Sequence, residues 1–481
     1  MERMWSKAYS YALKTAKRVR QRLTFIVGFN VNIDAVKHVN EGDVKRVFNF
    51  ASPSEVIRKI ESPPMEINSL EDFLAGFLLC VRNGLGEEWI IRDAAISHRL
   101  KELLGWDSTR MGGQGGNMSN IIAGMGHLAI PNAPSLPQQQ ADLFHDKNVL
   151  IPTLANGEVR FKPSSKAVRS RDEPLIHWIF EFGEGFRVKL GELEVKAPRE
   201  NRFIATFDDI NTRLEIAPGF WEGSMLKVEE ASACVVAGYH LLQEVYSDGT
   251  TYKEHIERTV SLIKDWKSVN PELTVHAEMG FTASVKVRKG ILNLLFPHVD
   301  SVGLNESELL QFSFPSRSVD WNSSSYSAPE IYLKARSLMS KYSLKRVFIH
   351  TREFSMSLLD DNYKVSPRSE LLSLLLGASL AATLAVTGST PTIEEAERLM
   401  TSEALKLSGK GLEEHQKLAV FLESEEGVNG ELLLKRGFVE GKPNLVFIPS
   451  KLASKLKGTV GLGDSICAGS LVGEHIFEKR E

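Results

Sequence analysis

Short apolar runs that end at a turn or a polar residue recur along the chain. Amphipathic helix patterns lie between many of them, for example at residues 252–266 and 328–342. Alternation of buried strands with helices is typical of a mostly parallel sheet that is covered on both faces. The chain is therefore expected to have an α/β fold. The predicted strands lie at residues 23–30, 233–239, 273–279, 299–305, 346–351 and 445–450.

Two regions depart from this alternation. Residues 35–111 are charged and rich in helical patterns, whereas residues 155–210 alternate apolar and polar positions like half-exposed strands. We expect these regions to form a smaller domain that covers a larger one. Residues 313–329 are rich in Ser and Pro and predict a surface loop. The large domain is expected to comprise residues 1–34, 112–154 and 211–481.

Composition narrows the possible functions. The chain has 481 residues, of which 42% are hydrophobic, and this length is enough for more than one domain. The formal net charge of −3 does not favour a nucleic-acid partner, which usually requires a basic excess. The chain has three cysteines and no two of them form a CxxC pair, so neither a disulfide framework nor a zinc site is expected. A reducing cytoplasm is the expected location.

Membrane association is not expected. The most apolar stretch, residues 371–388, is interrupted by Ser, Thr and Gly, and it predicts a buried core helix. Residues 1–23 are amphipathic and charged throughout, so they lack the apolar core of a signal peptide.

The sequence GLGD, residues 461–464, places a carboxylate between a glycine turn and a predicted helix. Gly461 and Gly463 permit a tight turn and a close approach of the backbone to a ligand. The amides of such a helix start attract anions, and Asp464 beside them would accept a proton from a hydroxyl group. Taken alone, the local pattern favours another interpretation, in which Asp464 is only an N-cap.

Polar side chains follow two predicted strands in succession. His276 and Glu278 are two residues apart in VHAEMG, and Asn305 and Glu308 are three apart in GLNESELL. Carboxylate and amide oxygens suit Mg²⁺, which is often held partly through water. Each pair also has an ordinary interpretation, a helix cap for Asn305 and a solvated side chain for Glu308. Their positions at successive strand ends, before the GLGD segment, favour the metal.

Two further motifs involve the first predicted strand and a glycine-rich turn. Asn30, Asn32 and Asp34 recur with period two in GFNVNIDAV and would suit a polyhydroxyl ligand, although Asx-turns in a loop would also explain them. The turn MGGQGGNMSN, residues 111–120, opens a helix. It is neither a dinucleotide-binding fingerprint nor a Walker A loop.

Together these motifs resemble the ADP-dependent sugar kinases, the archaeal ADP-dependent glucokinases and phosphofructokinases of the ribokinase-like superfamily. The resemblance spans nearly the whole chain in one order, through GFNVNIDA, MGGQGGN, FEFGEGFRV, AGYHLL, VHAEMG, DSVGLNESEL and TVGLGDSICAG. It implies a three-layer α/β/α large domain with a mostly parallel sheet and a smaller α+β lid. It also implies ADP as phosphoryl donor, AMP as product, and one divalent cation, Mg²⁺, for which Mn²⁺ can substitute.

The resemblance also implies roles for individual residues. Asp464 matches the catalytic base, in the turn that contains Gly461 and Gly463, and Arg202 matches an arginine that contacts the transferring phosphate. Glu278 and Glu308 match the residues that organise the metal. The sugar side would include Asn32, Asp34, Gly113 and Gln114. The nucleotide side would include Asn305, His350, Ser465 and the IPSKL segment, residues 448–452.

Three positions favour glucose over fructose 6-phosphate within this family. Glu88 and His177 match glucokinase residues, and Asp208 falls where the phosphofructokinases carry an arginine. Leu175 aligns with their phosphate-binding lysine, whereas the segments FRVKLGE and YSDGT resemble the phosphofructokinase branch. We therefore expect an ADP-dependent glucokinase, as a monomer or homodimer, with a phosphofructokinase or a bifunctional kinase as the alternative. A non-catalytic sensor is disfavoured because Asp464, Glu278 and Glu308 are retained.

Overall fold

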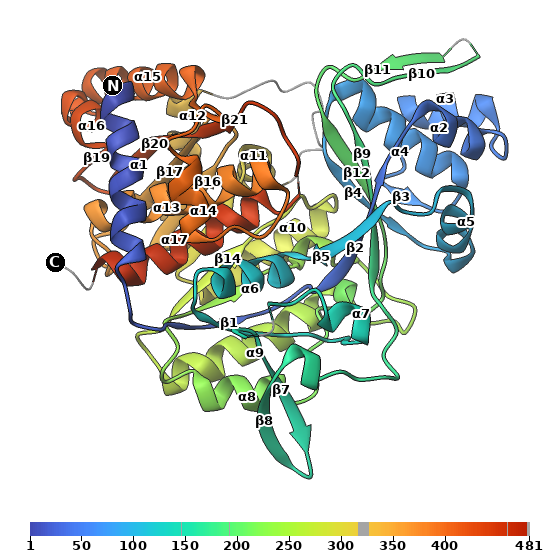
Figure 1. Ribbon diagram of the computed structural model, residues 1–481, viewed down its shortest axis with the longest axis horizontal. Coiled ribbons are helices and arrows are strands. Elements are labelled where there is room, and N and C mark those ends of the chain that lie inside the picture. The colour runs from blue at the N-terminus through green and yellow to red at the C-terminus, as the bar shows by residue number, and fades with distance from the viewer. Residues whose placement is uncertain (146, 192, 316–326, 459, 479–481) are drawn as a thin grey trace.

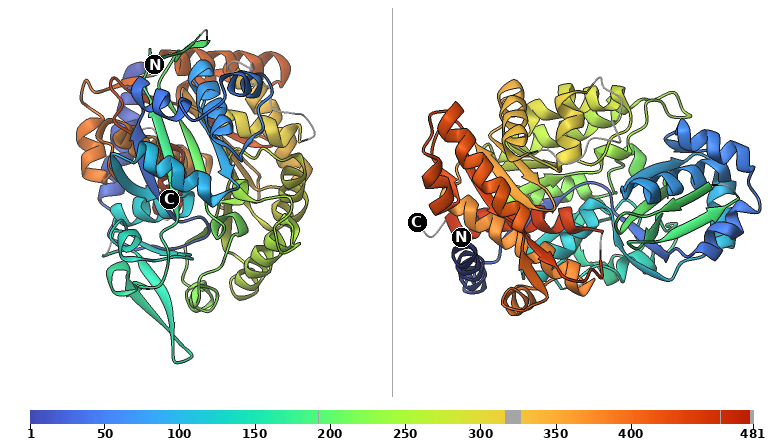
Figure 2. Two further views of the ribbon diagram at one scale, coloured as in Figure 1. Left: turned by 90° about the vertical axis from the view of Figure 1, so that its right-hand side faces the viewer. Right: turned by 90° about the horizontal axis from the view of Figure 1, so that it is seen from above.

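A large and a small β-sheet organise the protein. The computed structural model describes residues 1–145, 147–191, 193–315, 327–458 and 460–478. A nine-stranded sheet lies in the larger domain and a six-stranded sheet in the smaller one. The smaller domain occupies one end of the molecule, and the N-terminal helix α1 (Glu2–Lys17) and the C-terminal helix α17 (Leu462–Phe477) both lie in the larger domain (Figures 1 and 2). The arrangement is an α/β fold with two domains, as predicted.

The large sheet is mostly parallel. Strands β6, β1, β13, β14, β15 and β16 run parallel, whereas β17, β20 and β19 extend the sheet with antiparallel pairs. All six predicted strands are present in it. In sheet order the strands are β19 (Phe438–Val439), β20 (Asn444–Pro449), β17 (Phe354–Leu359), β16 (Arg346–His350), β15 (Ser301–Leu304), β14 (Thr274–Glu278), β13 (Ala233–Val236), β1 (Thr24–Val27) and β6 (Leu128–Pro131).

The sequence did not predict three of these strands. β19 is only two residues long, and β6 is the four-residue run LAIP, which ends in a proline and therefore does not read as a strand. β17 is fully buried but contains Ser355 and Ser357, which interrupt its apolar pattern. Its hydrogen bonds to β16 and β20 hold it in the sheet in spite of that pattern.

Helices cover both faces of this sheet and complete three layers. Phe25 and Val27 of β1 face one core, whereas Ile26 between them faces the other. The first face is covered by α1 (Glu2–Lys17), α6 (Gln114–Gly124), α7 (Gln138–Ala141), α13 (Pro367–Thr387), α14 (Ile393–Leu399) and α17 (Leu462–Phe477). The second is covered by α8 (Phe220–Lys227), α9 (Tyr252–Val269), α10 (Val285–Gly290), α11 (Glu306–Ser313), α12 (Ala328–Tyr342), α15 (Gly409–Glu425) and α16 (Gly430–Arg436).

The apolar helix predicted at residues 371–388 is part of the core. Helix α13 packs along α17, where Gly377 and Gly469 allow the two backbones to approach closely. Among the described residues, α13 is the one helix long and apolar enough to cross a membrane, and 67% of its apolar window is buried. The predicted helices at residues 252–266 and 328–342 are α9 and α12. The loop expected at residues 313–329 lies mostly outside the described residues.

The smaller domain is a mixed sheet with helices on one side. Its core includes residues of α2 (Glu41–Phe48), α3 (Pro53–Glu61), α4 (Leu70–Asn83) and α5 (Ala94–Leu104). In sheet order its strands are β3 (Glu66–Ile67), β4 (Glu87–Ile91), β12 (Asn201–Phe207), β9 (Ile176–Phe182), β2 (Asn32–His38) and β5 (Ser108–Gly112). A separate hairpin joins β10 (Arg187–Leu190) to β11 (Leu193–Lys196).

The domain limits expected from the sequence differ from this arrangement in two places. Strand β2 begins at Asn32, so the expected limit at residue 34 falls inside a strand of the small sheet. Strand β8 (Glu158–Pro163) pairs with β7 (Leu150–Ala155), and this hairpin packs against α8 of the large domain. Residues 155–163 therefore lie with the large domain, because their hairpin partner is there. A last pair of strands, β18 (Leu405–Leu407) and β21 (Lys451–Ala453), lies near the cleft described below.

Candidate active site

A cleft of about 1100 Å³ receives residues from both domains. The large domain contributes the carboxyl ends of β14 and β16 and the first turns of α11 and α17, and the small domain contributes β4, β9 and β12. Ligands of parallel α/β sheets bind at this end of the strands. The volume is large enough for a nucleotide and a sugar together.

Asp464 lies in the first turn of α17 and faces this cleft. The helix begins after Gly461, whose φ of 79° suits glycine, so Gly461 is the N-cap and Asp464 is not. The Asp464 carboxylate instead accepts a hydrogen bond of 2.8 Å from Nδ2 of Asn117. Burial raises the pKa of Asp464 to about 6, although the bond from Asn117 acts in the opposite direction. The N-cap interpretation of Asp464 is therefore wrong.

Ser465 is hydrogen-bonded within the first turn of α17. The amide and the hydroxyl of Ser465 both donate to the carbonyl oxygen of Gly461, at 2.9 and 2.8 Å. Ser465 is fully buried and does not line the cleft, so its expected contact with the nucleotide is not supported. The helix N–H groups that lack an intrahelical acceptor belong to residues 461–464. Gly461 and Gly463 both line the cleft.

Glu278 ends β14 and lies between two histidines. Its carboxylate contacts Nε2 of His276 at 3.1 Å and Nε2 of His350 at 2.9 Å. Burial acts to raise the pKa of Glu278, but the two histidines lower it to about 2. The pKa of His350 rises to about 9, because the bond to Glu278 outweighs the effect of burial. His350 lines the cleft beside Glu278, and its expected contact with the nucleotide stays a prediction.

Glu308 forms a reciprocal capping box with Asn305 at the start of α11. Its two carboxylate oxygens accept from the backbone and side-chain amides of Asn305, at 2.8 and 2.7 Å. The cap interpretation of Asn305 is thus confirmed. Glu308 is 6% exposed and burial raises its pKa to about 8, so the interpretation of Glu308 as a solvated side chain is wrong.

The acidic residues at these two strand ends suit a hard divalent cation. Glu278, Asn305 and Glu308 offer oxygen atoms, the ligands that Mg²⁺ prefers. The oxygens of both carboxylates already accept hydrogen bonds within the protein. Such a cation would therefore be held largely through water molecules, which matches the reluctance of Mg²⁺ to lose its own water.

Glu88 is the centre of a polar cluster at the small-domain side of the cleft. Its Oε1 accepts from the Thr206 hydroxyl at 2.7 Å and lies 3.4 Å from Nδ1 of His177, and its Oε2 lies 3.4 Å from Nε2 of His240. Burial acts to raise the pKa of Glu88, but the two histidines hold it well below its usual range. Glu88 is therefore a carboxylate at neutral pH.

The expected position of Asp208 in the sugar site is not found. Its side chain is fully buried, contacts Nε2 of His177 at 3.0 Å and accepts from the backbone amides of Ile210 and Asn211. Asp208 and Leu175 do not line the cleft. Burial acts to lower the pKa of His177, but Asp208 and Glu88 raise it to about 10. Asp208 therefore acts on the cleft through His177, whose protonated form it stabilises.

Asp34 and Asn32 have different positions on β2. Asp34 lines the cleft, and burial raises its pKa to about 6. Asn32 is fully buried and donates from Nδ2 to Asp34 at 2.9 Å, so it orients Asp34 rather than contacting a ligand. Asn30, at the end of the preceding segment, does line the cleft, and its buried Oδ1 has no hydrogen-bond partner among the described residues.

Gln114 and Gly113 lie where the glycine-rich turn enters α6, and both line the cleft. The Gln114 side chain donates to the carbonyl oxygen of Met279 at 2.7 Å and accepts from the amide of Gly238 at 2.9 Å. It therefore joins the ends of β13 and β14. A side chain at Gly113 would collide with the backbone oxygen of Asn30, at 2.3 Å.

Arg202 of β12 reaches the same cleft from the small domain. Burial lowers its pKa, and the carboxylates of Glu181, Asp34 and Asp464 act in the opposite direction. The guanidinium group remains charged, because the ordinary pKa of arginine is far above neutrality. The cleft thus contains a cation within electrostatic range of Asp464.

Helix α13 also contributes to the cleft. Small residues of α13 line it together with residues 450–456, which include the end of the IPSKL segment. The residues from α13 are Ala378, Ala381, Ala382 and Ala385.

Sequence reasoning missed Asn117, His240 and these four alanines. Asn117 belongs to the glycine-rich turn, and His240 follows β13 in the segment AGYHLL, but neither has a local signal that distinguishes it from a neighbouring polar residue. The alanines read as part of an apolar core helix. Only the packing of α13 against α17 shows which of its residues reach the cleft.

Comparisons with known proteins agree on one family. The sequence profile described as the ADP-specific Phosphofructokinase/Glucokinase conserved region matches residues 23–473. A protein named ADP-specific phosphofructokinase from Methanosarcina acetivorans is 31% identical over 97% of this chain and 96% of its own length. One named ADP-dependent glucose/glucosamine kinase from Pyrococcus furiosus is 32% identical over 98% and 99% of the two chains.

Solved structures show the same similarity. A structure titled as an ADP-dependent kinase in complex with fructose-6-phosphate and ADPbetaS has a TM-score of 0.83, with 28% identity over 100% of this chain and 99% of that one. A phosphofructokinase from Pyrococcus horikoshii with AMP has a TM-score of 0.74, with 27% identity over 96% and 100% of the two chains.

Proposed function

Because the chain belongs to the ADP-specific phosphofructokinase/glucokinase family and is an ADP-dependent sugar kinase, we propose that its sugar substrate is glucose. The products would be glucose 6-phosphate and AMP. The observation that carries this proposal is the Glu88 cluster. A carboxylate with a depressed pKa faces the sugar side of the cleft and would accept hydrogen bonds from sugar hydroxyls.

In the proposed reaction, Asp464 would accept the proton of the 6-hydroxyl group of glucose. The oxygen of that group would then bond to the β-phosphorus of ADP as the bond to AMP breaks. Asn117 would orient the carboxylate, since it is bonded to Asp464 at 2.8 Å. A pKa of about 6 leaves Asp464 mostly deprotonated at neutral pH and still close enough to neutrality for proton transfer.

Positive charge would stabilise the transferring phosphoryl group. Arg202 would contact its oxygens from the small domain, and the amides at the start of α17 would hold them from the large domain. Mg²⁺, when bound near Glu278 and Glu308, would supply further neutralisation of the phosphate charge. Closing the small domain over the cleft would keep water away from the phosphate, so that the sugar is the acceptor.

Fructose 6-phosphate is the second candidate substrate. His177 has a pKa of about 10 and lines the cleft beside His240, so a positive charge is available on the sugar side for a phosphate. The Methanosarcina relative is named a phosphofructokinase, and one similar structure holds fructose 6-phosphate. Glu88 opposes this candidate, because its carboxylate would repel a phosphate dianion.

One experiment separates these candidates. AMP release from ADP would be measured with glucose and with fructose 6-phosphate in parallel, and ATP would serve as the control donor. We expect release with glucose and a much lower rate with fructose 6-phosphate. Comparable rates would mean a bifunctional enzyme, and activity with fructose 6-phosphate alone would overturn the glucokinase proposal.

A further inference from the structure

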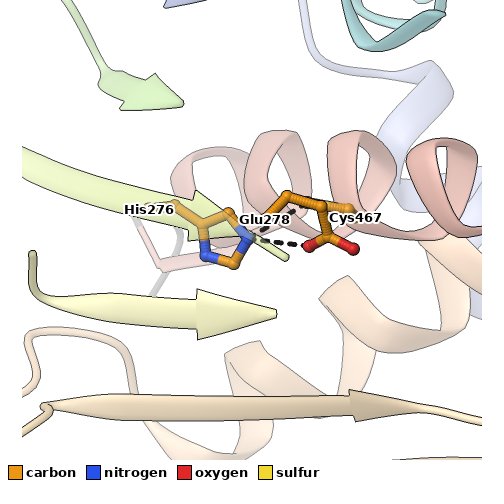
Figure 3. Close-up of side chains that lie close together, drawn as sticks. All are labelled: His276, Glu278 and Cys467. Atoms are coloured by element: carbon orange, nitrogen blue, oxygen red, sulfur yellow. Dashed lines mark hydrogen bonds and ion pairs between the residues drawn. The ribbon is translucent and has the colours of Figure 1, made fainter. Parts of the chain in front are cut away.

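Three potential metal ligands of different chemistry meet beneath the catalytic end of the cleft. They are His276 and Glu278 of β14 and Cys467 of α17, and their ligand atoms lie within 4.8 Å of one another (Figure 3). Nε2 of His276 is central, at 3.1 Å from Oε2 of Glu278 and 3.2 Å from Sγ of Cys467. We propose that this cluster binds a thiophilic divalent cation such as Zn²⁺ and that the bound ion inhibits the kinase.

The distances are close to those of a tetrahedral site. Zn–N and Zn–S bonds of about 2.0–2.3 Å place neighbouring ligands roughly 3.4–3.6 Å apart. The observed separations from Nε2 are only a few tenths of an ångström shorter. Glu278 also lines the cleft, so an ion would enter past it, and a water molecule from the cleft would supply a fourth ligand.

The residues around His276 are arranged to support a metal at Nε2. Its other nitrogen, Nδ1, lies 2.8 Å from the hydroxyl oxygen of Ser301. That oxygen accepts from the guanidinium group of Arg346 at 3.3 Å and keeps a second lone pair, which would accept a proton from Nδ1. Metal-binding histidines usually donate their second N–H in this way. A metal at Nε2 requires the tautomer with a proton on Nδ1, and Ser301 would accept a hydrogen bond from that proton.

The charges of the two anionic ligands match those of a divalent ion. All three side chains are buried, at 2% exposure or less, where an uncompensated charge is costly. Binding would displace the thiol proton of Cys467 to solvent, and His350, which contacts the other oxygen of Glu278 at 2.9 Å, would lose its proton as the ion binds. The thiolate and the Glu278 carboxylate would then balance the two charges of the ion. The sulfur and imidazole ligands distinguish this site from a Mg²⁺ site, because Mg²⁺ prefers oxygen.

Inhibition is expected because the proposed Zn²⁺ and Mg²⁺ sites share Glu278. Glu278 cannot both hold a buried Zn²⁺ and organise Mg²⁺ at the cleft surface. This consequence rests on the proposed function of the cleft, whereas the binding of the metal does not. A zinc site was not expected from the sequence, because the chain has no CxxC pair. That argument covers only ligands that are close in the sequence, whereas these three come from distant segments.

Co²⁺ tests the site without relying on activity, because a thiolate bound to Co²⁺ absorbs in the near ultraviolet. We expect one equivalent of Co²⁺ to produce this absorption in the full-length protein and one equivalent of Zn²⁺ to remove it. Cys467→Ser should abolish the band, whereas Cys80→Ser and Cys234→Ser should retain it, because those buried cysteines lie elsewhere. No band in the unaltered protein, or a band that survives Cys467→Ser, would overturn the proposal.

Inhibition is measured separately, by AMP release at saturating Mg²⁺ with increasing Zn²⁺. Cys467→Ser should raise the Zn²⁺ concentration for half-inhibition at least about tenfold, since loss of a supporting residue alone commonly weakens metal binding by about 10–100-fold. An equal sensitivity of the two proteins would refute the inhibitory part of the proposal. Failure of the sugar assignment would leave the cobalt result unchanged, so the two proposals fail independently.

Discussion

Asp464 and Asn117 are joined by a hydrogen bond of 2.8 Å although 347 residues separate them in the sequence. The bond connects the first turns of α17 and α6, which lie side by side on one face of the large sheet. It fixes the carboxylate that faces the cleft, and it lowers a pKa that burial alone would raise further.

Replacing Asp464 tests its proposed role as the base. Asp464→Ala and Asp464→Asn should each lower kcat by about 10²–10⁴-fold, the usual contribution of a positioned general base. Steady-state AMP release measures the change. Binding of ADP, measured by calorimetry, should change little, and near-normal turnover in either variant would show that another group accepts the proton.

Asn117 should control the pH dependence of the reaction. With a pKa of about 6 for Asp464, kcat/KM should rise as the pH increases through about 6, because the base must be deprotonated. Asn117→Ala removes a hydrogen bond that lowers this pKa, so the rising limb should move to higher pH. A pH–rate profile with an unshifted limb would mean that Asp464 does not govern it.

Glu88 should determine the choice of sugar. Glu88→Ala removes the carboxylate on the sugar side of the cleft, so KM for glucose should rise and the relative activity with fructose 6-phosphate should increase. Glu88→Gln keeps the shape of the side chain and removes its charge. It therefore separates the effect of hydrogen bonds to glucose from the effect of repulsion of the phosphate of fructose 6-phosphate. If neither substitution changed the ratio of kcat/KM for the two sugars, the glucose assignment would lose its main support.

Gly303 of β15 leaves the space that Glu278 occupies. A Cβ atom at this position would lie 1.9 Å from Oε2 of Glu278, so the carboxylate would have to move. Gly303→Ala should therefore reduce kcat and raise the Mg²⁺ concentration required for half-maximal activity. Gly409→Ala is the control, because no atom lies within 4 Å of its added Cβ. An unchanged Mg²⁺ requirement in Gly303→Ala would contradict the role of Glu278.

Arg346 should be important for stability. It is fully buried and forms ion pairs with Glu370 at 2.8 Å and Glu474 at 3.1 Å, which join β16 to α13 and α17. Arg346→Met leaves two buried carboxylates without their partner, and loss of about 3–5 kcal/mol in the free energy of unfolding is expected. Urea denaturation measures this change in the free energy of unfolding. Arg58→Ala, at an exposed pair with Glu55, should have almost no effect, and a similarly small effect at Arg346 would contradict the prediction.

Much of the architecture was predictable because local patterns carry it. The six predicted strands are short apolar runs that form the large sheet, and α13 was identified by its composition. β19 was missed because two residues carry no strand pattern, and β6 was missed because its short run, LAIP, ends in a proline. Strand β8, but not its partner β7, was expected in the smaller domain, because the packing partner α8 of this hairpin is distant in the sequence.

The sequence by itself determined the family, the strand ends at which the polar residues lie, and the positions of Asp464, Glu278 and Glu88. Only the tertiary structure decided which of these residues face the cleft. Asn32 and Asp208 proved to be buried partners of Asp34 and His177, and Ser465 bonds to its own helix turn. The tertiary structure also places Cys467 beside His276, although 191 residues separate them in the sequence. The physical reason is that side-chain direction and long-range contact depend on how helices pack on the sheet, which no local pattern specifies.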